Sequence, residues 1–109
     1  MQYRGGGGGM NEIVRQAARM QRKIEQARAE IKDQEVSFAA AGDKVRAVVT
    51  CERKVKRLEV DAAFWQSEGA EMALDALAAA VNGALEAADK KVDEHLAKVT
   101  GGAKVPGLY

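Results

Sequence analysis

Apolar residues in the first third of the chain recur every three or four positions, as they do along one side of an α-helix. They are Met10, Ile13, Ala17, Met20, Ile24, Ala27 and Ile31. This spacing predicts a helix that packs lengthwise against another helix. Asn11 is placed to cap its amino terminus, and residues 1–9, with five consecutive glycines, are expected to form a flexible leader.

The apolar period then changes to that of β-strands. Three short segments rich in β-branched residues follow, at residues 34–40, 44–52 and 54–61, with polar connections near residues 41–43 and 52–54. We expect three antiparallel strands in a meander with one face exposed to water. The other face of the middle strand would be apolar and would carry Val45, Ala47, Val49 and Cys51.

A second helical stripe extends from Ser67, the expected helix cap, to about Thr100, after a connector at residues 62–66. The stripe consists of Met72, Leu74, Leu77, Val81, Leu85, Ala88, Val92, Leu96 and Val99. Gly101 and Gly102 would end the helix. The predicted fold class is α+β, with a long N-terminal helix, a three-stranded antiparallel sheet and a long C-terminal helix in a single domain over residues 10–109.

Helices of this length are too long for so small a sheet. At 1.5 Å per residue they would extend about 37 Å and about 48 Å, and short strands cover only part of that length. We therefore expect the helices to project as antiparallel arms. A second copy of the chain would bury the apolar surface that remains, which predicts a homodimer.

The formal net charge of +1 conceals an uneven distribution of charge. Residues 10–23 carry four basic residues and one acidic residue, whereas residues 68–89 carry five acidic residues and no basic one. Antiparallel arms would place the basic start of the first helix beside the basic end of the second, at a shared tip. Arg15, Arg19 and Arg22 form one stripe roughly opposite the apolar positions. Such a stripe is either a solvated face or an anion-binding surface.

Catalytic chemistry has few candidates in this sequence. His95 is the only histidine and Cys51 the only cysteine, and they lie in different predicted elements. A metal site or a nucleophile–base pair requires further groups. We expect no catalytic residue, metal, cofactor or small-molecule substrate. The lone cysteine, together with the lack of a signal peptide and of a membrane-spanning apolar run, favours a cytoplasmic protein without a membrane partner.

Four segments match, in order and in spacing, a pattern found in one bacterial family. They read MNEIVRQAARMQRKIEQARAEI, DKVRAVVTCERKVKRLEVD, AAAVNGALEAADKKVDEHL and GGAKVPGLY. From Met10 to Leu108 the chain thus resembles the YbaB/EbfC family of nucleoid-associated proteins. The resemblance implies a tweezer-like homodimer on the cytoplasmic nucleoid that is not an enzyme. Such a protein binds double-stranded DNA, alters its conformation, and has roles in DNA compaction and transcription regulation.

The resemblance also associates both terminal helices with DNA contact. In this chain the corresponding DNA-binding residues are Arg15, Arg19, Arg22, Lys23, Lys90, Lys91 and Lys98. A basic run in the third strand gives the secondary DNA-binding candidates Arg53, Lys54, Lys56 and Arg57. Strand alternation predicts that its arginines share one face and its lysines the other.

Phosphate contact is the expected mode of DNA binding, because arginines on a stripe reach phosphates more readily than base edges. An alternative function is a helical clamp or adaptor that binds a protein or peptide partner, with the charges serving solubility. Salt dependence separates the two, since phosphate binding weakens steeply with salt and apolar burial does not.

Overall fold

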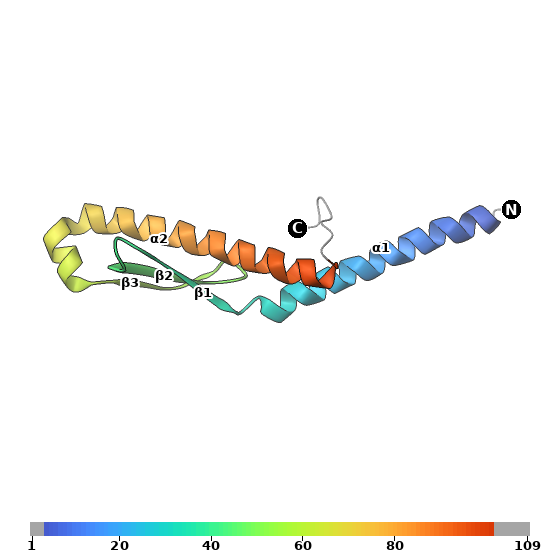
Figure 1. Cartoon of the computed structure of the whole chain (residues 1–109), viewed down its shortest axis with the longest axis horizontal. Helices are drawn as coiled ribbons and strands as arrows, with labels where there is room; N and C mark the ends of the chain where they lie inside the picture. Colours follow the sequence, from blue (N-terminus) through green and yellow to red (C-terminus); the bar gives the residue numbers. More distant parts are fainter. Residues whose placement is uncertain (1–3, 102–109) are drawn as a thin grey trace.

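The computed structural model describes residues 4–101, and their side chains from residue 9 onward. Its elements are α1 (Arg4–Ile31), β1 (Glu35–Ala40), β2 (Val45–Thr50), β3 (Val55–Val60) and α2 (Ala62–Val99). The strands form one antiparallel sheet in the order β1-β2-β3. α2 lies along one face of this sheet. α1 extends away from one end of the sheet, next to the carboxyl-terminal end of α2 (Figure 1). The predicted α+β class and the predicted order of elements are confirmed.

The sheet register aligns the apolar positions of the three strands. Val45 of β2 lies opposite Ala40 of β1 and Val60 of β3. The predicted apolar face of β2 is buried, and Val45, Ala47 and Val49 pack against α2. Their partners on α2 are Ala80, Ala84 and Ala88, which recur every four residues and so share one side of the helix. Small side chains there let the helix backbone lie close to the sheet.

The opposite face of the sheet is less exposed than the alternation of apolar and polar residues along β2 predicts. Val48 and Thr50 of β2 lie on this face and are nevertheless buried. The side chains of Glu35 on β1 and Arg57 on β3 meet at 3.6 Å. Because these two residues flank β2, their ion pair must reach across the central strand. Long side chains from the edge strands therefore shield the middle of the face from water.

A second apolar cluster joins α1 to the end of α2. Ile24, Ala27 and Ile31 of α1 pack against Val92 and Leu96 of α2, together with Cys51 at the end of β2. These α1 residues belong to the predicted three-and-four series, so its second half packs against another helix as expected. This cluster fixes the direction in which α1 leaves the sheet.

The start of α1 differs from the sequence-based expectation. The helix begins at Arg4 and includes the five glycines, rather than starting near Asn11. Asn11 is therefore within the helix and does not cap it. Each glycine in a helix costs about 1 kcal/mol relative to alanine, so this first part of α1 has the weakest intrinsic helix tendency. The flexibility of the leader stays a prediction, and residues 1–3 lie outside the described range.

The start of α2 also differs, because residues 62–66 are helical rather than a connector. Asp61 is the cap, and its side chain accepts a hydrogen bond from the Phe64 backbone N–H at 3.0 Å. Ser67 lies inside the helix, where its hydroxyl donates to the Phe64 carbonyl. Gly69 has non-helical angles (φ 88°, ψ 165°) and divides α2 into a short first segment and a long second one.

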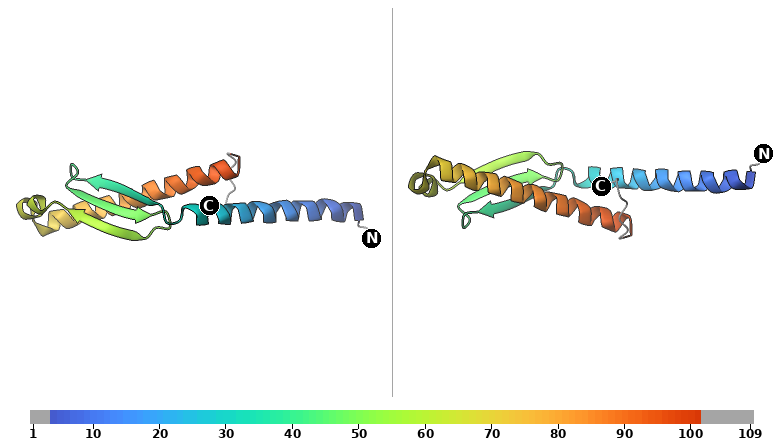
Figure 2. Two further views of the ribbon diagram at one scale, coloured as in Figure 1. Left: turned by 90° about the horizontal axis from the view of Figure 1, so that it is seen from below. Right: turned by 90° about the horizontal axis from the view of Figure 1, so that it is seen from above.

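The predicted pairing of the two helix ends at a common tip is wrong. α2 ends beside the middle of α1, where Met20 and Val99 border the same apolar cluster. The amino-terminal half of α1 continues beyond this point, and no other element within residues 4–101 lies beside it (Figures 1 and 2). The described chain is consequently elongated, with extents of 77 × 20 × 19 Å. Among the described residues, only the start of α1 forms a free arm.

Candidate nucleic-acid interface

The projecting part of α1 carries the first group of predicted DNA-binding residues. We define the arm as residues 9–23, which precede the buried Ile24. It contains four basic residues, namely Arg15, Arg19, Arg22 and Lys23, and one acidic residue, Glu12. All four basic side chains are exposed. The arm is therefore a net positive helix that water surrounds on nearly every side.

One carboxylate partly neutralises the arginine stripe. The Glu12 carboxylate lies 3.1 Å from the Arg15 guanidinium and 3.6 Å from that of Arg19. Both arginine side chains remain at least half exposed, at 61% and 51%. Within residues 9–101, Arg22 and Lys23 have no ion-pair partner. Exposed ion pairs of this type contribute only about 0–1 kcal/mol, so an incoming anion can displace Glu12.

The lysines of α2 lie at the base of the arm rather than on it. Lys90, Lys91 and Lys98 are exposed on the part of α2 that packs against the buried half of α1. Lys91 and Lys98 line a shallow hollow of about 260 Å³ together with Ile31 and Gln34. The structure thus brings these two lysines together, but places them beside the end of α1 and not beside Arg15.

The secondary basic run is divided between surfaces and paired with acids. A bulge in β3 places Val55 opposite Val49, which faces α2, but Arg57 opposite Val48, which faces away. Arg53 lies in the preceding turn with φ 72° and forms an ion pair with Asp89 of α2. The prediction that the two arginines share one face is wrong, because Arg53 lies in the turn before β3 and a bulge interrupts the alternation between Val55 and Arg57.

Two residues of this basic run also lie close to glutamate side chains. Lys54 lies 3.6 Å from Glu52, and Arg57 lies 3.7 Å from Glu59 in addition to its contact with Glu35. Lys56 is exposed. Because most of its charges are balanced locally, this run offers an anion much less net charge than the arm does.

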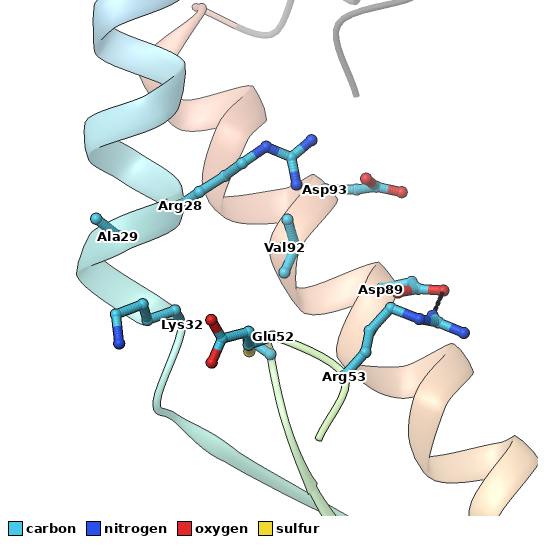
Figure 3. A pocket seen from close by; sticks show the side chains of 9 residues that line it. Arg28, Ala29, Lys32, Glu52, Arg53, Asp89, Val92 and Asp93 are labelled. Atoms are coloured by element: carbon cyan, nitrogen blue, oxygen red, sulfur yellow. Dashed lines mark hydrogen bonds and ion pairs between the residues drawn. The ribbon is translucent and has the colours of Figure 1, made fainter. Parts of the chain in front are cut away.

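A pocket that sequence reasoning missed lies between α1, the β2–β3 turn and α2. Its volume is about 590 Å³. The rim carries both signs of charge, from Arg28, Lys32 and Arg53 and from Glu52, Asp89 and Asp93 (Figure 3). These residues come from three elements far apart in the sequence, which is why no local pattern indicated them. The side chains are too balanced in charge to favour an anion or a cation.

The chemistry of this pocket does not resemble a catalytic site. Cys51 forms part of its wall and is buried. Burial raises the pKa of the Cys51 thiol, an effect that nearby Lys91 partly offsets. The thiol is therefore protonated near neutral pH, whereas the thiolate is the nucleophile. Among residues whose side chains are described, no group of histidine, cysteine and acidic residues is arranged to hold a metal ion.

The sequence pattern of this elongated chain is shared with a family of known proteins. A sequence model described as the YbaB/EbfC DNA-binding family matches residues 6–103. The chain belongs to the YbaB/EbfC family. The match includes the arm, the whole sheet and all of α2, and it covers α1 from residue 6 onward.

Bacterial relatives match over nearly the full length of the chain. A nucleoid-associated protein of Acetivibrio thermocellus is 36% identical, over 98% of this chain and 96% of its own. Nucleoid-associated proteins of Alkaliphilus metalliredigens and Clostridium kluyveri are 33% and 30% identical, each over 96% of this chain and 92% of their own. None of the helices within residues 4–101 combines the length and apolar character needed to cross a membrane.

Proposed function

We propose that this YbaB/EbfC protein binds double-stranded DNA as a homodimer, mainly through phosphate contacts of the arm, and alters DNA conformation on the nucleoid. Its roles would be nucleoid organisation and gene regulation, without catalysis. One observation carries the proposal: α1 projects beyond the rest of the molecule with an exposed arginine stripe (Figure 1). The family description and the names of the relatives support DNA as the partner.

The spacing of the stripe suits a phosphate backbone. Arg15 and Arg22 are seven residues apart, which is about 10 Å along a helix axis. Duplex DNA carries about one negative charge per 1.7 Å of its axis, so each basic residue of the arm can lie near a phosphate. Four contacts from each of two arms predict that the logarithm of the DNA-binding constant falls with the logarithm of salt concentration with a slope of about −7.

Two arms per dimer would also explain a change in DNA conformation. A homodimer presents the same stripe twice, on arms related by its twofold axis. If both stripes contact one duplex they constrain its path, and if they contact two duplexes they bridge them. Lys90, Lys91 and Lys98 would add contacts only where DNA reaches the base of the arm. They are therefore secondary to the arginines in this proposal.

Charge reversal on the arm tests the proposal. The variant Arg15→Glu/Arg19→Glu/Arg22→Glu should lose most DNA affinity in gel-shift titrations with unrelated duplexes, and its residual binding should depend little on salt. A matched control, Lys32→Glu/Lys44→Glu/Arg46→Glu, makes the same change in net charge at positions outside the arm and outside the candidate DNA-binding residues, and should bind far better. Equal affinity of the arm variant and the unmodified protein, with the dimer intact, would refute the site.

The alternative of a helical clamp has one observation in its favour. The apolar residues Met10, Ile13 and Val14 are exposed on the arm, where a peptide partner would bury them. The same titrations decide between the functions. Absence of DNA binding at low salt would favour the clamp, whereas uniform binding that weakens steeply toward physiological salt supports the nucleoid role.

A further inference from the structure

His95, the only histidine of the chain, connects the two helices at the base of the arm. Its Nε2 atom lies 3.2 Å from a carboxylate oxygen of Glu30 on α1. The ring is 28% exposed, so it contacts both the protein and water. Histidine is the side chain whose charge ordinarily changes between about pH 5 and about pH 8. A change of pH near neutrality therefore alters the charge at this contact.

The same ring lines the hollow that contains two lysines of α2. Four lining residues share one side of α2 at spacings of i, i+3, i+4 and i+7, namely Lys91, Glu94, His95 and Lys98. Ile31 and Gln34 close the hollow from the α1 side. Within residues 9–101, Lys91 and Lys98 form no ion pair. Both ammonium groups are therefore available to an anion that enters the hollow.

The charges at the hollow cancel as long as the His95 ring is neutral. Lys91 and Lys98 supply two positive charges, while Glu94 in the wall and Glu30 beside the ring supply two negative ones. Protonation of the ring leaves one net positive charge. The hollow is thus balanced at higher pH and attracts anions at lower pH.

Other ionisable groups near this part of α2 are directed elsewhere. At the end of α1, Lys32 and Asp33 pair with each other at 3.2 Å. In the β2–β3 turn, Cys51, Glu52 and Arg53 line the separate pocket of about 590 Å³. Burial raises the pKa of the Cys51 thiol, so it stays protonated near neutral pH. These groups leave His95 as the side chain that changes the charge of the hollow.

Protonation also changes the hydrogen bonding of the ring. A carboxylate only accepts hydrogen bonds, so Nε2 of a neutral ring carries the proton that contacts Glu30, and Nδ1 is then an acceptor. Within residues 9–101, Nδ1 has no hydrogen-bond partner. In the protonated ring Nδ1 becomes a donor, while Nε2 keeps its contact with Glu30. The ring thus gains the donor that a phosphate oxygen requires.

We propose that protonated His95, together with Lys91 and Lys98, holds a phosphate group in this hollow, so that contact with DNA at the base of the arm strengthens as the pH falls. The inference rests on the proposed function in taking the DNA backbone as the source of the phosphate. It adds to the arginine stripe a contact that a single proton controls.

The pH dependence of DNA binding tests this proposal. Gel-shift titrations should show an affinity about three- to tenfold higher at about pH 6 than at about pH 8, the effect of one added charge near each bound phosphate. The slope of the logarithm of the binding constant against that of salt concentration should also steepen by about 1.8 for a dimer with two hollows, because each protonated ring displaces a further counterion.

Two substitutions at position 95 separate the charge of the ring from its structural role. His95→Gln keeps a polar side chain that does not titrate, and its affinity and salt slope should be the same at both pH values. His95→Arg is charged at both, and at about pH 8 it should bind as the unmodified protein does at about pH 6. An equal gain on acidification in His95→Gln would overturn the proposal.

The lysines are tested with a matched pair of variants. Lys91→Gln/Lys98→Gln should lose most of the gain on acidification, because the protonated ring then faces two carboxylates without support. Lys32→Gln/Lys44→Gln removes the same charge outside the hollow and should keep the full gain. A full gain in the first variant would show that the hollow does not hold the phosphate.

The NMR signal of the single histidine separates this inference from the proposed function. Inorganic pyrophosphate at about pH 6 should shift the His95 ring resonances in the unmodified protein and not in Lys91→Gln/Lys98→Gln. A shift without any DNA binding would support the hollow and assign it to free phosphate compounds, and the proposed function would fail. DNA binding with the same pH profile in His95→Gln, and no shift with pyrophosphate, would overturn the inference and leave the proposed function standing.

Discussion

At the scale of single residues, Glu12 limits the charge that the arm presents. Its carboxylate contacts Arg15 and Arg19, so DNA must compete with it for both guanidinium groups. We predict that Glu12→Gln tightens DNA binding by about two- to fivefold, since an exposed pair of this type is worth at most about 1 kcal/mol. Gel-shift titration at fixed salt measures the change. Glu25→Gln makes the same charge change outside the arm, and an equal gain there would show that only bulk charge matters.

Gly83 permits close contact between α2 and the edge of the sheet. A Cβ atom at this position would lie 2.3 Å from Cδ2 of the Phe38 ring. We predict that Gly83→Ala lowers the free energy of unfolding by about 1–3 kcal/mol through this overlap. In a Phe38→Ala background the ring is absent, and Gly83→Ala should instead stabilise by up to about 1 kcal/mol through helix propensity. Urea denaturation of the four proteins forms a double-mutant cycle, and additive effects would contradict the prediction.

At the scale of elements, the course of α2 depends on a break in the helix at Gly69. Gly69 has φ 88° and ψ 165°, a region that other residues reach only at a cost of about 1–3 kcal/mol. We predict that Gly69→Ala lowers stability by that amount in thermal or urea unfolding. Ala70→Gly is the reciprocal control and should cost only about 1 kcal/mol. If the Gly69→Ala protein were as stable as the unmodified one, the bend would not require glycine at a position with positive φ.

The helix boundaries show which local signals were decisive. Ser67 and Glu68 resemble a helix start, but Asp61 followed by two alanines is an equally valid one, and the structure uses it. The strands were predictable because alternation over residues 45–51 matches the buried face of β2. The bulge between Val48 and Val49 was not predictable, since nothing in the third strand marks an extra residue.

At the scale of the whole molecule, β3 leaves an apolar surface uncovered. α2 packs mainly over β1 and β2, and Leu58 on β3 is 50% exposed although it lies opposite the buried Ala47. We infer that the second copy of the proposed homodimer covers this part of β3. In the monomer Leu58 already contacts water, so replacing it with a polar residue should leave the fold intact.

Leu58→Asp is the corresponding test of the dimer. A buried carboxylate at the interface should weaken dimerisation by about 2 kcal/mol or more, roughly thirtyfold in Kd. Sedimentation over a range of protein concentrations measures the change. Ser37→Asp introduces the same group on the opposite face of the sheet and should leave dimerisation unaffected. A Leu58→Asp dimer of undiminished affinity would place the interface elsewhere.

The sequence by itself determined the elements and the distribution of charge, because both depend on periods and spacings that neighbouring residues create. It specified two long helices, a three-stranded meander, an arginine stripe and a resemblance to a family. Only the tertiary structure decided how far the helices run beside each other. Apolar periodicity indicates that one side of a helix is apolar, but it does not indicate where along the helix that side is covered. Ile13 and Ile24 occupy equivalent positions in the pattern. One is buried and the other exposed because α2 ends between them, beside Met20.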